Sequence, residues 1–224
     1  MSNKSFPVKA IGVFVVLLLL TANLSSSVLA KDEKPEKVEI RNYKGEKLGS
    51  ADHFREVSIK GVQQIDKEEY RLKLTGLIEK DRELKYSELQ EMNHIEKVVT
   101  LHCVEGWSVK ALWEGIPLKE LFSTLEINPE VNTVIFHAAD GYTTSLSMSH
   151  IMENNIIIAD HLNGLELPPK QGFPFQLVAE QKWGYKWIRW ITKIELSANE
   201  EFQGYWESRG YSDDGDLDEP KFGN

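Results

Sequence analysis

The chain has 224 residues, 41% of them hydrophobic and 27% charged, with a formal net charge of −9 at pH 7 and one cysteine. That length suffices for one domain with a substantial core, and the negative charge argues against nucleic acid, whose phosphates favour clustered lysine and arginine. A single cysteine also excludes an internal disulfide bridge.

The N-terminus has the pattern of an export signal. Lys4 and Lys9 precede an apolar segment at 10–22, and small residues lead to Ala30. This pattern is typical of a cleaved signal peptide, and the apolar segment is short for a membrane-spanning helix. We therefore expect a signal peptide or N-terminal anchor at 1–30, followed by a tether at 31–50. The protein would then be periplasmic or otherwise extracytoplasmic, with membrane anchorage as the alternative.

Alternation of apolar and polar residues predicts the first elements of the folded part. Residues 70–78 alternate and form a half-buried strand. Ser87 and the residues after it fit a capping box, so a short helix is expected to start there. Residues 97–103 are expected to form the next strand. Pro117 suits the first position of a helix that continues to Leu125.

The second half of the chain is predicted to consist of hairpins. Asp140-Gly141 and Asn163-Gly164 have the composition of tight turns between strands. The elements expected around them are strands at 133–137, 142–146, 156–161, 175–179 and 186–196, and a short helix at 149–153. Many short strands with few helices indicate a mixed α+β domain, at 51–211, rather than a βαβ alternation. Residues 212–224 are acidic and are expected to form a solvated tail.

Cys103 closes an apolar strand immediately before the polar segment Val104–Trp107. A free cysteine is commonly a small buried hydrophobe, but strand ends that feed loops are where sites are built. Three chemistries are open to it. It could be a nucleophile with a histidine base, a zinc ligand, or the one protein thiolate on a metal that a cofactor completes. The histidines considered as bases are His102, His137, His150 and His161, of which His102 points to the opposite face of the strand. Zinc is disfavoured because no second ligand follows at the usual spacing.

Several segments in order resemble the molybdenum-pterin domain of the sulfite oxidase superfamily. They are LHCVEGWS at 101–108, WEGIPL at 113–118, DGYTTSL at 140–146, GFP at 172–174, KWGYKWIR at 182–189 and GYWESRGY at 204–211. The resemblance covers about Phe54 to Tyr211. It is closest to the compact bacterial and archaeal branch that includes the periplasmic methionine-sulfoxide-reducing enzyme. It implies the sulfite-oxidase-type molybdopterin-binding fold and a molybdenum–molybdopterin cofactor.

The resemblance also implies roles for individual residues. Cys103 matches the cysteine whose thiolate binds molybdenum, and Tyr142 matches a tyrosine near the metal, although an aromatic residue packing across a hairpin explains it as well. The residues that it implies for cofactor binding are Arg189 as the main phosphate ligand, Lys182, Gly184 and Lys186 beside it, and Lys60 as a pterin contact. Outside the family, Arg189 would be a solvated charge on a strand face.

Two departures from the family pattern bear on cofactor and substrate. Gln171 and Gln176 stand where larger relatives have an Asn or His and an Arg, so they can bind a phosphate without neutralising it. The paired arginines around the cysteine of sulfite oxidases are missing, and Glu105 would repel sulfite. A neutral, sulfoxide-like substrate is therefore favoured. No haem-binding motif is present, so we expect electrons to pass to or from a separate protein, such as a membrane haem or quinone-linked one.

These observations favour an exported molybdopterin-dependent oxidoreductase that performs two-electron oxygen-atom-transfer chemistry on a small molecule. An alternative is a non-catalytic exported binding protein that retains the molybdopterin fold. A third possibility is a structural exported domain in which Cys103 is inert.

Overall fold

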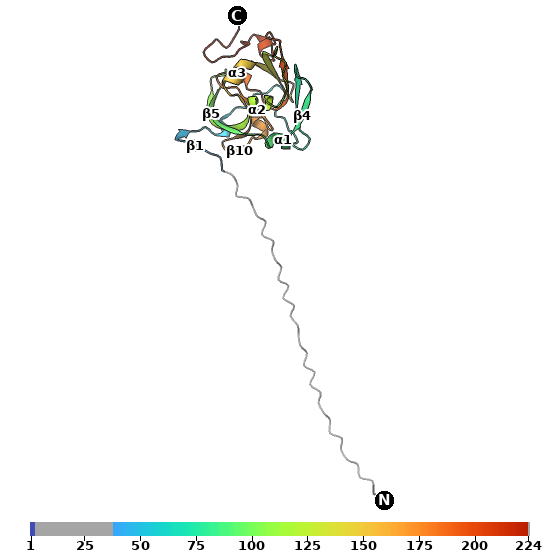
Figure 1. Ribbon diagram of the computed structural model, residues 1–224. Helices are drawn as coiled ribbons and strands as arrows, with labels where there is room; N and C mark the ends of the chain where they lie inside the picture. Colours follow the sequence, from blue (N-terminus) through green and yellow to red (C-terminus); the bar gives the residue numbers. More distant parts are fainter. Residues whose placement is uncertain (3–37, 224) are drawn as a thin grey trace. The chain divides into compact units, whose positions relative to one another are not determined.

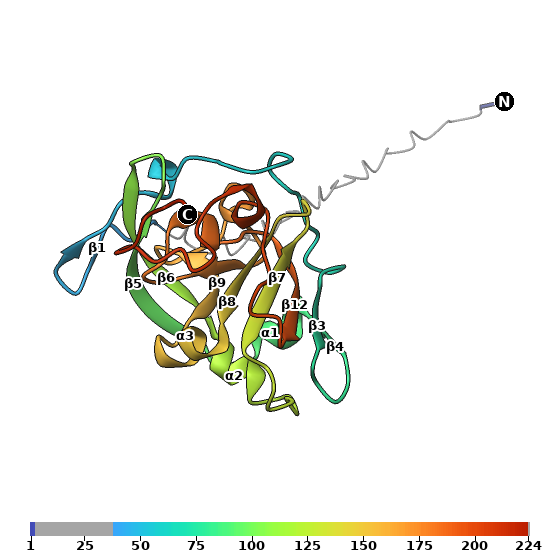
Figure 2. The same cartoon turned by 90° about the horizontal axis from the view of Figure 1, so that it is seen from above.

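Two five-stranded sheets share one apolar core. Figures 1 and 2 show how their elements are arranged in space. The computed structural model describes residues 1–2 and 38–223. The first sheet has the order β10 (Leu165–Glu166), β9 (Ile157–Leu162), β6 (Ser108–Pro117), β5 (Ile95–His102), with β11 (Gln176–Val178) also paired to β9. The second has the order β4 (Arg82–Lys85), β3 (Arg71–Gly76), β12 (Ile191–Ser197), β7 (Thr133–Ala138), β8 (Thr143–Ser147). Neighbouring strands are antiparallel, except that β3 and β12 are parallel.

Short helices and turns complete the architecture. The α-helices are α1 (Tyr86–Gln90), α2 (Leu118–Phe122) and α3 (Met148–Glu153). A small hairpin, β1 (Asn42–Tyr43) with β2 (Glu46–Lys47), precedes the sheets. The 3-10 turns are η1 (Ala51–His53), η2 (Pro169–Gln171), η3 (Gly184–Lys186) and η4 (Glu207–Arg209). The predicted α+β class is confirmed. Within the described residues, the helices are all too short or too polar to cross a membrane.

The core consists of side chains that alternate inward from both sheets. Leu72 and Leu74 of β3 and Ile194 and Leu196 of β12 are fully buried. Burying each such side chain contributes about 2 kcal/mol. Trp113 of β6 is also fully buried, and its ring lies 5.6 Å from that of Trp187. This core fixes the ends of the strands, where the loops that form the pocket begin.

The N-terminal boundary of the fold differs from the prediction. The Glu39 carboxylate accepts hydrogen bonds from Ser50 Oγ (2.9 Å), the Ala51 amide (2.7 Å) and Asn163 Nδ2 (2.8 Å). Residues 38–50, expected to be a tether, are therefore packed on the domain. The predicted signal and the first part of the tether fall almost entirely on residues 3–37, outside the described part of the chain.

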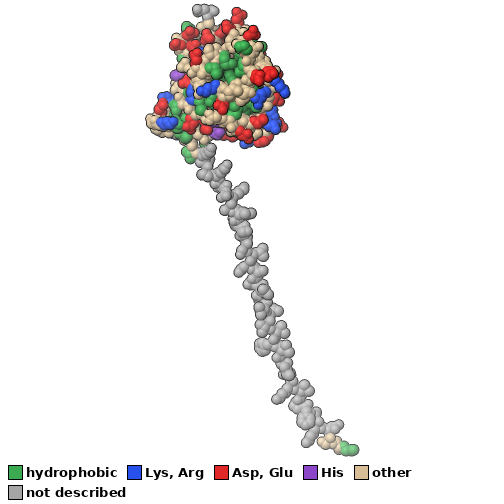
Figure 3. Space-filling view, viewed as in Figure 1, with side chains coloured by type: hydrophobic (Ala, Val, Ile, Leu, Met, Phe, Trp, Pro, Cys, Tyr) green, Lys and Arg blue, Asp and Glu red, His purple; other side chains and the backbone are tan. Residues whose placement is uncertain are grey.

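The C-terminal boundary also differs, because the segment expected to be a solvated tail is anchored to the domain, although most of its acidic side chains are exposed. Residues 211–223, here called the C-terminal strap, fold back onto the domain. Lys182 forms an ion pair with Asp216, and Lys186 Nζ donates to the Asp213 carbonyl at 2.7 Å. Acidic side chains colour the upper part of the face in Figure 3, where Figure 1 shows the C-terminus.

Two further expectations are corrected at the level of single elements, and one strand was missed. Helix α1 begins at Tyr86 with Lys85 as its N-cap, so Ser87 is not the cap. The expected strand at 186–196 begins only at Ile191, because a 3-10 turn precedes it and Trp190 has a φ of +53°. Strand β6 was not predicted at all.

Candidate active site

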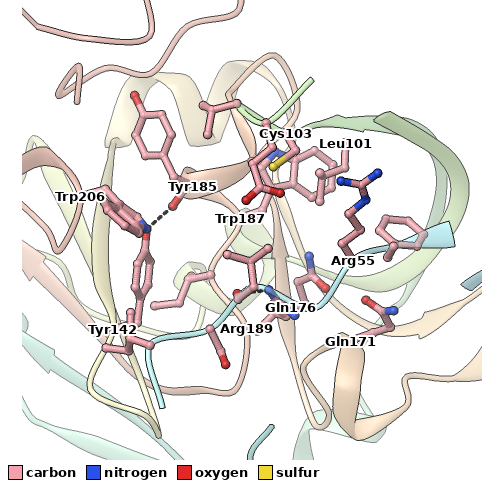
Figure 4. A pocket seen from close by; sticks show the side chains of 18 of the residues that line it. Arg55, Leu101, Cys103, Tyr142, Gln171, Gln176, Tyr185, Trp187, Arg189 and Trp206 are labelled. Carbon is pink, nitrogen blue, oxygen red and sulfur yellow. Dashed lines mark hydrogen bonds between the residues drawn. The ribbon is translucent and has the colours of Figure 1, made fainter. Parts of the chain in front are cut away.

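A pocket opens where the β5–β6 loop meets the β7–β8 turn and the chain between η3 and β12, as Figure 4 shows. Its empty volume is about 1060 Å³, including space open to solvent, which is ample for a cofactor-sized ligand. Aromatic and apolar side chains form most of the wall, among them Phe54, Leu101, Trp107, Tyr185, Trp187, Ile188, Trp206 and Tyr211. The predicted residues that line it are Cys103, Tyr142, Gln171, Gln176, Gly184 and Arg189.

Cys103 lies one residue beyond the end of β5 and faces this pocket half-buried. The Cys103 amide donates to the Trp107 carbonyl (2.9 Å), and the Gly106 amide donates to the Cys103 carbonyl (3.0 Å). Gly106 has a φ of +90°, a conformation that favours glycine, and this lets the loop turn tightly. A short, closed loop therefore presents the thiol at a defined point of the wall.

The electrostatics around Cys103 do not favour a free nucleophile. Burial raises the pKa of its thiol and the Glu105 carboxylate adds to this, while a backbone hydrogen bond from Glu105 and the charges of Arg55 and Lys221 oppose it. Activated cysteines instead have a lowered pKa and an adjacent base. No histidine is found among the described residues that line the pocket. The described part of the chain also contains no cluster of three or more His, Cys, Asp or Glu residues that could hold a metal ion. A bound metal ion would supply the positive charge that holds a thiolate.

The histidines considered as bases are engaged elsewhere. His137 Nε2 lies 3.0 Å from Glu195 Oε2, His150 Nε2 lies 3.1 Å from the Glu180 carbonyl, and His161 Nδ1 lies 3.0 Å from Asp160 Oδ1. His102, the last residue of β5, is not among the residues that line the pocket. The nucleophile hypothesis therefore has no base in the described part of the pocket.

Arg189 lines the pocket, but its guanidinium already contacts backbone carbonyls. One nitrogen donates to the Lys170 carbonyl at 3.0 Å and another donates to that of Val57, and the group lies 5.1 Å from the centre of the Trp190 ring. Burial lowers the pKa of Arg189, whereas Glu56 and Asp140 act in the opposite direction. Arg189 therefore ties the segment after Phe54 to the pocket wall and also brings a positive charge to it.

The predicted lysines do not reach the pocket lining. The side chain of Lys186 is buried, with Nζ 2.8 Å from Glu207 Oε1, and Lys182 pairs with Asp216. Lys60 lies beside the β7–β8 turn, where a Cβ added to Gly141 would come within 3.3 Å of its Nζ. The structure thus brings Gly184 and Arg189 together at the pocket and leaves the lysines outside its wall.

Two glutamines form a buried polar part of the pocket. Gln171 Nε2 donates to the Ala51 carbonyl at 3.0 Å. Gln176 is only 2% exposed, and its Oε1 has no hydrogen-bond partner among the described residues; Ser58 Oγ is likewise unpartnered. A buried acceptor without a donor is costly, so these atoms suit a ligand that carries N–H groups, as a pterin does.

Tyr142 is held in the wall by its own hydroxyl. Its OH donates to the Tyr185 carbonyl at 2.5 Å, and its ring centre lies 5.7 Å from that of Tyr205. Burial and the nearby Glu207 raise its pKa well above the ordinary value. Asp140 Oδ1 accepts the Tyr142 amide at 2.9 Å, which is the turn role expected of it.

Sequence reasoning missed Arg55 and Ser58, which line the pocket from the irregular segment before β3. Figure 4 shows Arg55 at the same end of the pocket as Cys103. The segment around Cys103 lacks the paired arginines of sulfite oxidases, but Arg55 brings an arginine to this end of the pocket from another part of the chain. The two positive charges of the lining, on Arg55 and Arg189, are balanced by the two negative charges of Glu105 and Asp140. The segment that carries Arg55 and Ser58 has no apolar periodicity from which its position could be predicted. The adjacent Phe54 is buried and anchors it, with its ring 5.5 Å from that of Trp113.

Fold and site together define a cofactor-binding redox domain, and the comparisons with known proteins agree. A family model described as "Oxidoreductase molybdopterin binding domain" matches residues 59–206. The chain belongs to this family of the sulfite oxidase superfamily and is a molybdopterin-dependent oxidoreductase, which confirms the predicted resemblance.

The relatives differ in length from this chain. It is 30% identical over 151 residues to "Putative protein-methionine-sulfoxide reductase subunit YedZ1" of Azospira oryzae, covering 67% of this chain and 57% of the relative. It is 28% identical to "Uncharacterized oxidoreductase YuiH" of Bacillus subtilis, covering 67% and 76%. It is 26% identical to "Protein-methionine-sulfoxide reductase catalytic subunit MsrP" of Campylobacter jejuni, covering 91% and 75%.

A solved structure shares the fold. The sulfane dehydrogenase SoxCD of Paracoccus pantotrophus superposes with a TM-score of 0.60 at 21% sequence identity, covering 62% of this chain and 41% of that one. The predicted sulfite-oxidase-type fold is therefore confirmed. At this identity the likeness concerns the fold alone.

Proposed function

We propose that the protein is an exported oxidoreductase that uses molybdenum–molybdopterin to reduce a small, neutral, sulfoxide-like substrate. The observation that carries this is the pocket itself. It combines a half-buried thiol, a buried amide oxygen and a buried hydroxyl that both lack partners among the described residues, and a lining without net formal charge. The residues present fit the cofactor, because soft thiolate sulfur suits such a metal and buried acceptors suit a pterin edge.

Each residue has a proposed task. Cys103 would bind the metal through Sγ, Gln176 Oε1 would accept an N–H of the pterin, and Arg189 with Arg55 would bind the phosphate or other anionic groups. When bound, the cofactor would supply two-electron oxygen-atom transfer. In the overall reduction the S–O bond of the sulfoxide breaks, sulfur gains two electrons, and the oxygen leaves as water with two protons.

The charge of the lining supports a neutral substrate over sulfite. Glu105 and Asp140 balance Arg55 and Arg189, and an anionic cofactor phosphate would occupy part of the positive charge. An anion would then enter a pocket with a net negative field, which raises the free energy of binding. Two relatives with methionine-sulfoxide reductase in their names are consistent with this substrate class.

Electron supply and location belong to the same proposal. The names of two relatives describe them as subunits, which supports a separate electron-transfer protein for this chain. The N-terminal sequence supports export and leaves membrane anchorage as an alternative.

Metal analysis of the protein purified from a molybdopterin-producing host tests this proposal. We expect near-stoichiometric molybdenum in the wild type and almost none in Cys103→Ser, since serine is a harder and weaker donor. A folded Cys103→Ser protein with full molybdenum and full activity would refute the role of Cys103. A wild type without molybdenum would refute the cofactor assignment.

A second assay separates the enzyme from the non-catalytic binding protein. With a reduced dye as electron donor, we expect dye oxidation with methionine sulfoxide. With the oxidised dye as electron acceptor, we expect little dye reduction with sulfite. A molybdenum-loaded protein that is inactive on both classes of substrate would favour the binding protein instead.

A further inference from the structure

The loop that carries Cys103 is held by the C-terminal strap as well as by its own hydrogen bonds. Lys221 Nζ donates to the Val104 carbonyl at 2.9 Å. The chain at Gly184 packs against the start of the same loop, where an added Cβ would come 3.2 Å from the His102 carbonyl oxygen and 3.4 Å from Cys103 Cα. The loop therefore lies between a glycine that permits close approach and a charged donor from the strap.

Lys221 reaches this position because the end of the strap pairs with its beginning. The Ser212 amide donates to the Lys221 carbonyl (3.1 Å), and the Gly223 amide donates to that of Gly210 (3.1 Å). The rings of Tyr211 and Phe222 lie 5.0 Å apart across this pairing. The Lys221 ammonium also lies 4.9 Å from the centre of the Trp183 ring, a cation–π contact that limits its freedom.

The middle of the strap is anchored to the segment that borders the pocket. The Trp183 amide donates to the Gly215 carbonyl (2.8 Å), and the Leu217 amide donates to that of Gln181 (3.1 Å). The ion pair of Lys182 and Asp216 adds a side-chain contact at the same place. The strap is thus a fixed support from which a lysine can act on the loop.

The loop has reason to need such support. Residues 103–107 connect two strands, and at Gly106 an added Cβ would meet nothing within 4 Å of the described chain. A charge-assisted hydrogen bond to a carbonyl in the middle of the loop is about twice as strong as a neutral one. Functional groups need to be held to within about 0.5 Å of their working position.

We propose that Lys221 is a positioning residue that fixes the Cys103 loop through the Val104 carbonyl. That the fixed loop matters for a metal site rests on the proposed function. That Lys221 holds the loop rests only on its hydrogen bond to the Val104 carbonyl. The strap is then part of the active-site architecture, although Lys221 itself is not among the residues that line the pocket.

Hydrogen exchange of the full-length, cofactor-free protein tests the link. In Lys221→Met, which keeps an unbranched stem and removes the donor, we expect the amides of Cys103 and Gly106 to exchange about tenfold faster. Lys221→Arg can still donate to the carbonyl and stack on Trp183, so it should restore exchange to within about twofold of the wild type. Lys67→Met, at an exposed site, is the control and should change neither amide.

Two results would overturn the proposal. One is unchanged exchange of both amides in Lys221→Met. The other is equal acceleration throughout β5 and β6, which would mean general destabilisation. In the metal-loaded protein, X-ray absorption at the molybdenum edge should show a more disordered sulfur shell in Lys221→Met and recovery in Lys221→Arg. A wild type without molybdenum would defeat the proposed function and leave the exchange result to decide the role of Lys221.

Discussion

Gln176 is unusual among the pocket residues because its side chain is buried with an unpartnered acceptor. Gln171, close to it in the sequence, is equally buried, but its amide donates to a backbone carbonyl. One glutamine thus stabilises the empty fold, whereas the other carries a desolvation cost of about 1–3 kcal/mol that a ligand could recover. Polar groups kept at such a cost are commonly found at binding sites.

Replacing either glutamine by leucine should change the free energy of unfolding of the cofactor-free protein, but in opposite directions. Gln176→Leu should leave the free energy of unfolding of the cofactor-free protein unchanged or raise it by about 1 kcal/mol, because an unpaired polar group is removed. It should also lower cofactor retention about tenfold. Thermal unfolding and molybdenum content measure the two effects.

Gln171→Leu is the matched control. It breaks the hydrogen bond from Gln171 Nε2 to the Ala51 carbonyl, which then keeps only the Phe54 amide at 3.3 Å, so the cofactor-free protein should lose about 1 kcal/mol of stability. A Gln176→Leu protein that loses stability like Gln171→Leu and still retains its cofactor would contradict the ligand role of Gln176.

At the scale of elements, a buried ion pair joins η3, β8 and η4. Lys186 Nζ lies 2.8 Å from Glu207 Oε1, and Thr144 Oγ1 donates to the same oxygen at 2.6 Å. The side chains of Lys186 and Glu207 are 1% and 0% exposed. Burial lowers the pKa of Lys186, and the Glu207 carboxylate acts in the opposite direction. The pair therefore fixes the segment that borders Cys103.

Removing one partner should be far worse than removing both. Lys186→Met leaves a buried carboxylate unpaired and should cost about 3–5 kcal/mol, whereas Lys186→Met combined with Glu207→Leu should recover most of that loss. Urea denaturation of the wild type, Lys186→Met, Glu207→Leu and the double variant measures the four corners of this cycle.

The exposed pair of Lys73 and Glu83, 3.5 Å apart, is the control for this cycle. Breaking it with Lys73→Met should cost no more than about 1 kcal/mol, because solvent screens both charges. A double variant at Lys186 and Glu207 that is no more stable than Lys186→Met would show that the buried pair contributes through packing rather than charge.

Periodicity found the elements whose contacts are local and missed those fixed by distant partners. The strand before Cys103 and the Asp140-Gly141 turn follow from alternation and turn chemistry. Strand β6 was missed because its second half, which contains Glu114, Gly115 and Pro117, lacks the alternation of a strand. It is nevertheless buried almost throughout, because β6 pairs with β5 and β9 on both sides.

The site residues show the same limit. Lys186 is a charged residue and would be expected on an exposed strand face. It is buried because Glu207, 21 residues later, supplies its partner. Arg55 comes from a segment without regular structure, so no pattern could place it beside Cys103. The position of the thiol was predictable from an apolar run that ends abruptly, and its role as a metal ligand stays a prediction.

At the scale of the whole domain, a second buried cluster lies on β9, away from the residues that line the pocket. Asp160 is fully buried, with Oδ1 3.0 Å from His161 Nδ1 and Oδ2 3.2 Å from His94 Nε2, and Gln90 of α1 donates to Oδ2. His94 Nδ1 also lies 2.8 Å from the Met92 carbonyl, so both ring nitrogens face acceptors. Only the protonated ring can donate to both.

The cluster gives the stability of the domain a defined pH dependence. The hydrogen bond to Asp160 raises the pKa of His94, with burial opposing. Burial would raise the pKa of Asp160, but hydrogen bonds from His161, His94 and Gln90 lower it overall. A histidine whose pKa is raised by folding contributes stability that is fully present below its unfolded pKa. This contribution is lost as pH rises through the folded pKa. A lowered carboxyl pKa stabilises above its unfolded value and is lost as pH falls.

The stability difference between wild type and Asp160→Asn should therefore be largest between about pH 4 and pH 6.5, the unfolded pKa values of the two groups. It should shrink as pH rises through the folded pKa of His94 and again in strong acid. Burial lowers the pKa of His137 and His150, which gives them the opposite dependence. Taking the difference between the two proteins cancels their effect, and Asp81→Asn, at an exposed site, should show no such profile. Urea denaturation from pH 4 to pH 9 measures the difference, and a value that is constant across this range would contradict a charged Asp160–His94 pair.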